Sequence, residues 1–95
     1  MSGSDTDTTY ISNVIRKRIK TAGARFNAND NIAEFIEDGE LELLQQEVEK
    51  KMTEVLKSLV IDIETDHNTQ ETARRVAKMY VREVFAGRYH KMPPI

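Results

Sequence analysis

The apolar residues of this chain recur mainly at intervals of three and four, the spacing of an α-helix, and they predict three main helices. The first is expected over residues 10–22, with Thr8 or Thr9 as its cap and Gly23 as its stop signal. Its apolar stripe consists of Ile11, Val14, Ile15 and Ile19.

A second helical region follows a polar loop, and Gly39 divides it. We expect a short helix over residues 31–38, a break at Asp38 and Gly39, and a long helix over residues 40–61. About twenty helical residues span roughly 30 Å, more than a small three-helix core needs, so this helix is expected to pack on another subunit or domain. Its apolar face consists of Leu41, Leu44, Val48, Met52, Val55, Leu56 and Leu59.

The third helix is expected over residues 70–86, and its start has two alternatives. Asn68 and Glu71 have the spacing of a capping box, whereas Thr72 is also placed to cap a helix that opens just after it. Gly87 is the expected stop. The face predicted to be buried consists of Val76, Ala77, Tyr80, Val81 and Val84.

No segment has a convincing strand pattern, so the predicted fold is all-α, with three main helices and an extended tail. Residues 1–9 form a polar lead that we expect to be disordered, and residues 10–92 form one helical region. The tail ends in Pro93 and Pro94, which cannot continue a helix.

The composition narrows the function classes. A chain of 95 residues buries only roughly 60–65% of its unfolded surface, so an isolated fold is expected to be marginal. It contains no cysteine, which excludes disulfides and thiolate metal sites within it. Neither a secretory leader pattern nor an apolar run of membrane-spanning length is visible, and we expect a soluble, cytoplasmic protein with no membrane partner.

The net charge of −2 conceals three segments of different sign. Residues 1–29 carry a net charge of +3, residues 30–66 carry −9, and residues 67–95 carry +4. An acidic middle between basic ends favours pairing within or between copies of the chain, and it argues against nucleic acid as the partner. The basic residues at helical spacing are Arg16, Lys17, Arg18 and Lys20, and Arg74, Arg75, Lys78 and Arg82.

Few side chains suit catalysis. His67 and His90 flank the third helix, more than twenty residues apart, and are poor candidates for one metal-ligand set. Asp62, Glu64 and Asp66 precede His67 and have two interpretations: a weak divalent-ion site, or a solvated turn before a helix amino terminus, which we favour. The sequence therefore predicts no catalytic, cofactor-binding or metal-binding residue in this chain.

The third helix and its flanks read Asn-Thr-x-x-Thr-Ala-x-Arg-Val-Ala-x-Met-Tyr, followed by Glu, Phe and Gly. This pattern resembles the helix that leads into the catalytic domain of GTP cyclohydrolase I, although Ala73 stands where that family usually has proline. The resemblance covers about residues 30–92 and is strongest in the last third. The matching residues are Asn68, Thr69, Thr72, Arg75, Val76, Ala77, Met79, Tyr80, Glu83, Phe85 and Gly87.

The resemblance implies the N-terminal helical part of an α+β enzyme with the T-fold, with residues 93–95 at the start of the catalytic domain. Family members convert GTP to 7,8-dihydroneopterin triphosphate and formate, the first step of tetrahydrofolate, pterin or 7-deazaguanine synthesis. They use a zinc ion held by two cysteines and a histidine, and they assemble typically as two stacked pentamers.

This segment is therefore expected to serve folding and homo-oligomer assembly, with GTP and zinc requiring the catalytic domain. Because the chain lacks the family's zinc ligands and catalytic residues, we do not expect it to be active alone. The alternative is a stand-alone helical module that binds or regulates another protein without catalysis.

Overall fold

The computed structural model describes residues 10–90, and within that range it contains helices and turns but no strand. The predicted all-helical fold is confirmed for this part of the chain. Its elements in chain order are α2 (Ile11–Thr21), the 3-10 helix η2 (Ala33–Phe35), α3 (Glu40–Ser58), α4 (His67–Met79), the π-helical segment η3 (Tyr80–Val84) and α5 (Ala86–Tyr89).

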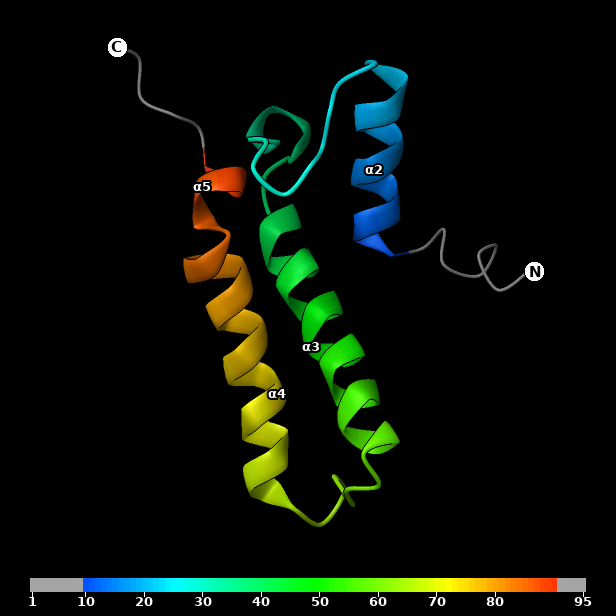
Figure 1. Cartoon of the computed structure of the whole chain (residues 1–95), viewed down its shortest axis with the longest axis vertical. Helices are drawn as coiled ribbons and strands as arrows, with labels where there is room; N and C mark the ends of the chain where they lie inside the picture. The colour runs from blue at the N-terminus through cyan, green and yellow to red at the C-terminus, as the bar shows by residue number, and fades with distance from the viewer. Residues whose placement is uncertain (1–9, 91–95) are drawn as a thin grey trace, which may run out of the picture.

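The helices α3 and α4 form an antiparallel hairpin, and α2 lies beside the half of α3 that is farthest from the hairpin turn (Figure 1). The loop between α2 and α3 crosses the top of this arrangement and meets α5 there (Figure 1). The molecule thus has an upper end built from several segments and a lower end built from the hairpin alone. Its buried hydrophobic residues are Ile15, Ile19, Ile32, Ala33, Leu44, Ala73, Ala77 and Val81.

The first helix begins and ends close to the predicted positions. Tyr10 precedes it and makes no side-chain cap, while the candidate caps Thr8 and Thr9 lie outside the described residues. At the other end, Gly23 takes the left-handed conformation, with a φ of 70°. The Gly23 and Ala24 N–H groups donate to the Lys20 and Ile19 carbonyls, the paired bonds of a Schellman cap.

The prediction of a helix over residues 31–38 is wrong, because only Ala33–Phe35 form a single 3-10 turn. Two bonds to other groups occupy the backbone here: the Ala33 N–H donates to the Asn31 side chain at 2.9 Å, and the Ile32 N–H donates to the Arg88 carbonyl at 2.7 Å. The predicted break is present, since Gly39 has a φ of 83° immediately before α3 begins.

The long helix ends at Ser58, three residues earlier than predicted. The Val60 and Ile61 N–H groups donate to the Lys57 and Leu56 carbonyls, which is the same Schellman cap that ends α2. Here, however, the left-handed position belongs to Val60, with a φ of 64°. A β-branched side chain in that conformation is strained, so the chain leaves this helix at an energetic cost.

Both alternatives for the start of the third helix are wrong. The helix begins at His67, and Asp66 caps it by accepting a hydrogen bond from the Thr69 N–H at 3.2 Å. The Thr72 hydroxyl instead donates back to the Asn68 carbonyl at 2.9 Å. An aspartate at this position satisfies the free N–H groups of the first turn, which is why the helix begins earlier than predicted.

The predicted stop at Gly87 is also wrong. The α-helix gives way to the π-helical segment at Tyr80, and the Phe85 N–H donates to the Tyr80 carbonyl at 3.0 Å, five residues back. The Tyr80 and Phe85 rings stack across this turn, with centroids 6.1 Å apart. Gly87 then lies inside the short helix α5 and does not adopt a positive φ.

The two Schellman caps predict opposite effects of substitution. Val60→Gly is expected to stabilise the folded monomer by about 1 kcal/mol, because glycine adopts the left-handed conformation without strain. Gly23→Ala is expected to destabilise it by about 1 kcal/mol, since a Cβ there meets no other atom and only the backbone is strained. Urea unfolding followed by circular dichroism, on dilute protein, measures both changes.

Gly87→Ala is the matched control, because Gly87 lies in a helix with open space around a Cβ. It is expected to leave stability unchanged or raise it by up to about 1 kcal/mol. Equal destabilisation by both glycine substitutions would contradict the assignment of strain to the left-handed positions.

Candidate assembly surface

Several large apolar side chains that the helical pattern predicts to be buried are exposed. Val55 of α3 is 51% exposed, and Leu59, just after α3, is 63% exposed. In η3, Tyr80 is 40% and Val84 is 55% exposed. The predicted burial is therefore wrong for Tyr80 and Val84, and within residues 10–90 nothing covers these four side chains fully. Leu43, Val60 and Met79 are the other large hydrophobic residues exposed within residues 10–90.

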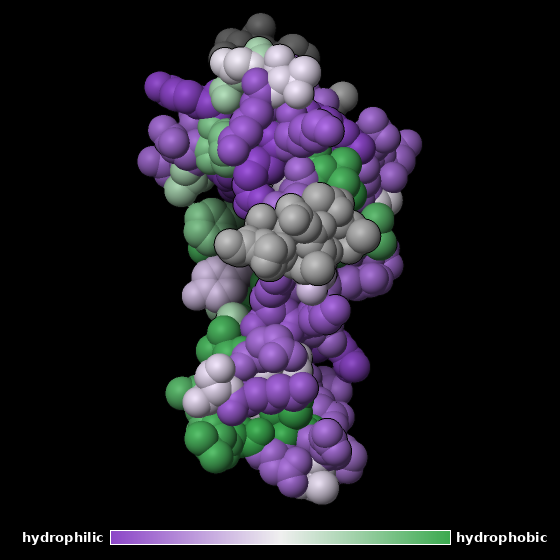
Figure 2. All heavy atoms as spheres, turned by 90° about the vertical axis from the view of Figure 1, so that its right-hand side faces the viewer, coloured by the Kyte–Doolittle hydropathy of each residue, from purple (hydrophilic) through white to green (hydrophobic). Residues whose placement is uncertain are grey.

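The largest exposure lies where α3 turns toward α4. Val60 is 93% exposed although it is apolar and strained. Figure 2 shows hydrophobic surface gathered at the lower end of the molecule, over the hairpin turn. We call this the hairpin-end patch, and it consists of Val55, Leu59 and Val60, which are exposed, and Ile61 and Ile63, which are half-buried.

The acidic residues beside the patch have structural roles. Asp62 accepts hydrogen bonds from the Glu64 N–H and the Thr65 hydroxyl, at 3.2 and 2.9 Å, and so holds the turn together. Asp66 caps α4, and the hydrogen bonds from Thr69 lower the pKa of its carboxyl. Among residues 10–90, no group of three or more His, Asp or Glu side chains is arranged to hold a metal ion.

The two histidines lie far apart, as their spacing predicts. His67 opens α4, whereas His90 follows α5 at the opposite end of the same run of helix (Figure 1). They share no site. Asp62 and Asp66 lie together in the turn, where the Asp66 N–H donates to the Asp62 carbonyl at 3.0 Å, and His90 lies far from both.

The basic residues of the two rows are largely exposed and only partly paired. Arg74 forms an ion pair with Glu71 of its own helix at 3.1 Å, and Arg82 donates to Gln45 of α3 at 2.8 Å. Arg75 and Lys78 form no ion pair within residues 10–90. Lys17 and Arg18 line a hollow along α2, and Arg16 and Arg74 each line another hollow.

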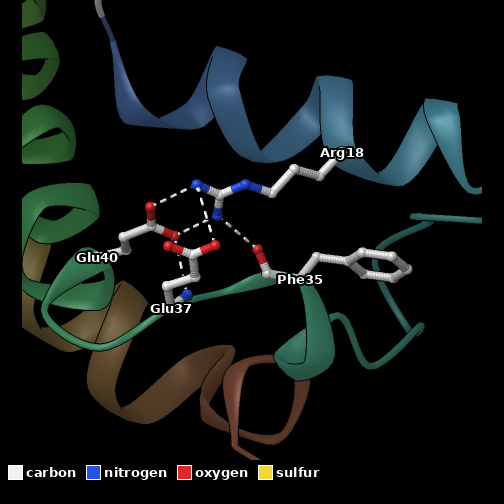
Figure 3. A network of polar contacts seen from close by, with 4 residues as sticks. All are labelled: Arg18, Phe35, Glu37 and Glu40. Atoms are coloured by element: carbon white, nitrogen blue, oxygen red, sulfur yellow. Dashed lines mark hydrogen bonds and ion pairs between the residues drawn. The ribbon is translucent and has the colours of Figure 1, made fainter.

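Arg18 is the basic residue with a defined structural role. Its guanidinium donates to both carboxylate oxygens of Glu40, at 2.5 and 2.7 Å, and to the Phe35 carbonyl at 2.9 Å (Figure 3). Glu37 lies farther away, with a carboxylate oxygen 3.8 Å from the guanidinium, and its N–H donates to Glu40 at 2.8 Å. We call Arg18, Phe35, Glu37 and Glu40 the polar anchor.

The polar anchor joins three segments: α2, the turn after η2, and the first residue of α3. Glu40 is only 9% exposed, so its charge is compensated by hydrogen bonds and not by water. The hydrogen bonds from Arg18 hold the pKa of that carboxyl below its usual value, against the effect of burial.

A second polar contact fixes the start of α2. Ser12 donates to Glu47 of α3 through both its N–H and its hydroxyl, at 2.9 and 2.5 Å. The carboxylate thus caps a helix other than its own, which replaces a local cap at Tyr10. The Tyr10 ring lies 4.3 Å from the Lys51 ammonium and adds a cation–π contact.

Neither the polar anchor nor the Ser12–Glu47 contact follows from sequence patterning. Both join residues more than twenty positions apart, at 22 and 35 positions respectively. In the sequence, these contacts were indicated only by the excess of basic residues in residues 1–29 and of acidic residues in residues 30–66. That excess indicated pairing within or between copies without naming the partners.

No helix of residues 10–90 is both long and apolar enough to cross a membrane. The exposed apolar residues form a patch at the hairpin turn and scattered positions along the helices. Such a surface is suited to burial against another apolar surface.

Comparison with known proteins gives a partial match. The chain is 46% identical over 52 residues to a protein named GTP cyclohydrolase 1 from Vibrio vulnificus, which covers 54% of this chain and 24% of that protein. The protein of the same name from Sodalis glossinidius is 47% identical over 51 residues, and that from Vibrio cholerae is 44% identical over 43 residues.

The match covers 48% of this chain and 23% of the Sodalis protein, and 45% of this chain and 19% of the Vibrio cholerae protein. The chain thus spans about a quarter or less of the length of the curated relatives it matches. No family model matches the chain, and no solved structure matches it. The similarity therefore reaches about half of the chain and supports the family named from its third helix.

The polar anchor predicts a pH dependence. Because Glu40 has a lowered pKa in the folded state, the pair stabilises the fold above the unfolded carboxyl pKa of about 4.3 and loses this effect as the pH falls through the lower, folded-state value. Glu40→Gln is expected to lower the melting temperature at pH ~7 and to reduce its fall below pH ~4.3.

Glu37→Gln is the matched control, since the Glu37 side chain is 74% exposed and only reaches Arg18 at 3.8 Å. It is expected to change the melting temperature little at any pH. Melting curves recorded at stepped pH measure both variants. If the melting temperature falls equally below pH ~4.3 in wild type and Glu40→Gln, the Arg18–Glu40 pair does not cause that fall.

Proposed function

We propose that this chain is the N-terminal helical region of a GTP cyclohydrolase I and that it serves folding and homo-oligomer assembly. The hairpin-end patch carries the proposal, because it is a strained, exposed apolar surface at the end of a helical hairpin. The similarity of about half of the chain to proteins named GTP cyclohydrolase 1 supports the family.

The energetics of Val60 favour an assembly role over a purely local one. A glycine would occupy the same left-handed position without strain, as Gly23 does at the end of α2. Val60 instead exposes 93% of its surface to water, and burial against a partner would remove that exposure. In the assembled state, the apolar contact offsets the cost of the strained turn.

The patch suits a second copy of the chain as its partner. Apolar surface of this kind is buried in oligomers, and symmetric contacts place the same patch on both copies. The acidic residues around it, Asp62 and Glu64, limit how closely two patches approach in a parallel face-to-face contact. An offset contact that sets the acidic turn of one copy against Arg75 or Lys78 of the other relieves that repulsion.

Catalysis belongs, in this proposal, to other parts of the enzyme. The family opens the imidazole ring of GTP with a zinc ion held by two cysteines and a histidine. This chain has no cysteine, so its residues do not fit that ligand set. GTP turnover by the isolated chain is not expected.

Sedimentation velocity over a range of protein concentrations tests the assembly role. The wild-type chain is expected to self-associate, and Val60→Gly is expected to weaken the association about tenfold or more, because it removes the most exposed apolar side chain of the patch. The same substitution is expected to stabilise the monomer, so a loss of association cannot be attributed to unfolding.

Leu43→Asn is the matched control. Leu43 is also apolar and 49% exposed, but it lies near the start of α3, away from the hairpin turn. Its substitution is expected to leave association unchanged. The assembly role would be overturned if the chain remained monomeric at every concentration, or if Val60→Gly self-associated as strongly as the wild type. A monomer that bound an intact GTP cyclohydrolase I would support the regulatory alternative.

A further inference from the structure

A cavity lies at the upper end of the molecule, away from the hairpin-end patch. It has a volume of about 140 Å³ and lies where α2, the loop after it, α3 and α5 meet. Its lining residues are Ser12, Ile15, Arg16, Ile19, Phe26, Ile32, Leu44, Arg88 and Tyr89. Neither the proposed assembly role nor the family resemblance assigns a purpose to this cavity.

The inner wall of the cavity is apolar. Ile15, Ile19 and Ile32 form the main buried cluster of the upper end, and Phe26 and Tyr89 pack against them half-buried. A cavity of about 150 Å³ with walls of this kind accepts a benzene ring. The space therefore suits a single ring or a branched aliphatic group of similar size.

The rim of the cavity is basic. Arg88 donates to the carbonyls of Phe26, Asn27 and Asp30, which hold its guanidinium in place without neutralising it. Arg16 donates to the Asn13 side chain, and neither arginine forms an ion pair with a carboxylate within residues 10–90. We call Arg16 and Arg88 the rim arginines.

Two carboxylates lie close to the lining within residues 10–90, those of Glu47 and Asp30. Glu47 accepts both hydrogen bonds from Ser12, so it lies at the α2–α3 side of the cavity, and these neutral donors leave its charge in place. Asp30 pairs with Arg25, at 3.1 Å. The two rim arginines and Glu47 form no ion pair within residues 10–90, so the charges at the cavity sum to a net positive charge.

We propose that this cavity binds a small monocarboxylate with one ring or a branched aliphatic body. The apolar part lies against Ile15, Ile19 and Phe26, and the carboxylate lies at the rim arginines. An arginine donates two parallel hydrogen bonds to a carboxylate, which fixes the orientation of the anion. Ammonium groups are disfavoured beside the rim arginines, and the volume of about 140 Å³ accommodates one ring.

Methyl-resolved NMR titration of the full 95-residue chain tests the proposal, with benzoate as the probe and benzyl alcohol and benzylamine as neutral and cationic counterparts. Benzoate is expected to shift the methyl signals of Ile15, Ile19 and Ile32, with a dissociation constant on the order of 1 mM for a ligand of this size. Benzyl alcohol is expected to bind at least about threefold more weakly, and benzylamine more weakly still.

Two substitutions test separately how the charge of Arg16 and the volume of the cavity contribute to binding. Arg16→Gln changes an exposed residue and is expected to weaken benzoate about threefold or more while leaving benzyl alcohol unchanged. Leu44→Phe adds volume at the cavity wall and is expected to abolish binding of both, with its folding checked by the same spectra.

The absence of shifts at these isoleucines with benzoate would overturn the proposal. So would equal binding of benzoate and benzylamine, or an unchanged benzoate affinity in Arg16→Gln. Binding that persists in Leu44→Phe would place the ligand elsewhere on the surface. The helices α2 and α5, which contribute to the cavity, lie at the opposite end of the molecule from the hairpin turn (Figure 1). Failure here therefore leaves the assembly proposal to its own test.

Discussion

The ion pair between Arg18 and Glu40 is the contact on which the upper end of the molecule depends. A carboxylate with 9% of its surface exposed must be compensated, and Arg18 and the Glu37 N–H supply the hydrogen bonds that do so. Because Glu40 follows the left-handed Gly39, the same contact fixes both the position of α2 and the direction in which α3 leaves the loop. The apolar cluster and the cavity with its basic rim lie between elements that this contact holds together.

Periodicity was sufficient to predict the helices, and it failed where distant groups compete for the backbone. The stripe of the first helix and the break at Gly39 follow from local properties and are present. The segment 31–38 has helical spacing, yet Asn31 and the Arg88 carbonyl take its N–H groups. No local pattern reveals a partner 56 positions away, and the π-helical turn at Tyr80 has no sequence signal of its own.

The sequence predicted that the second helix would have apolar surface beyond its own core, but it did not predict which residues form that surface. The length of the second helix indicated that it needed a partner beyond its own core, and Val55 and Leu59 are indeed exposed. A helical period assigns residues to a face, but it does not say whether the chain itself covers that face. The left-handed conformation of Val60 could not be predicted, because valine rarely adopts a positive φ and glycine is the expected residue for that conformation.

The two ends of the molecule therefore differ in how far their polar groups and apolar surfaces are satisfied by other residues of the chain. At the upper end, buried charge, helix starts and loop carbonyls are satisfied within the chain by Arg18, Glu47 and Arg88. At the lower end, an apolar surface and a strained residue stay exposed as far as residues 10–90 are concerned. Strain persists only where surrounding structure or function maintains it, which agrees with the proposal that another copy of the chain covers the lower end. The upper end then supplies a rigid support from which the hairpin projects.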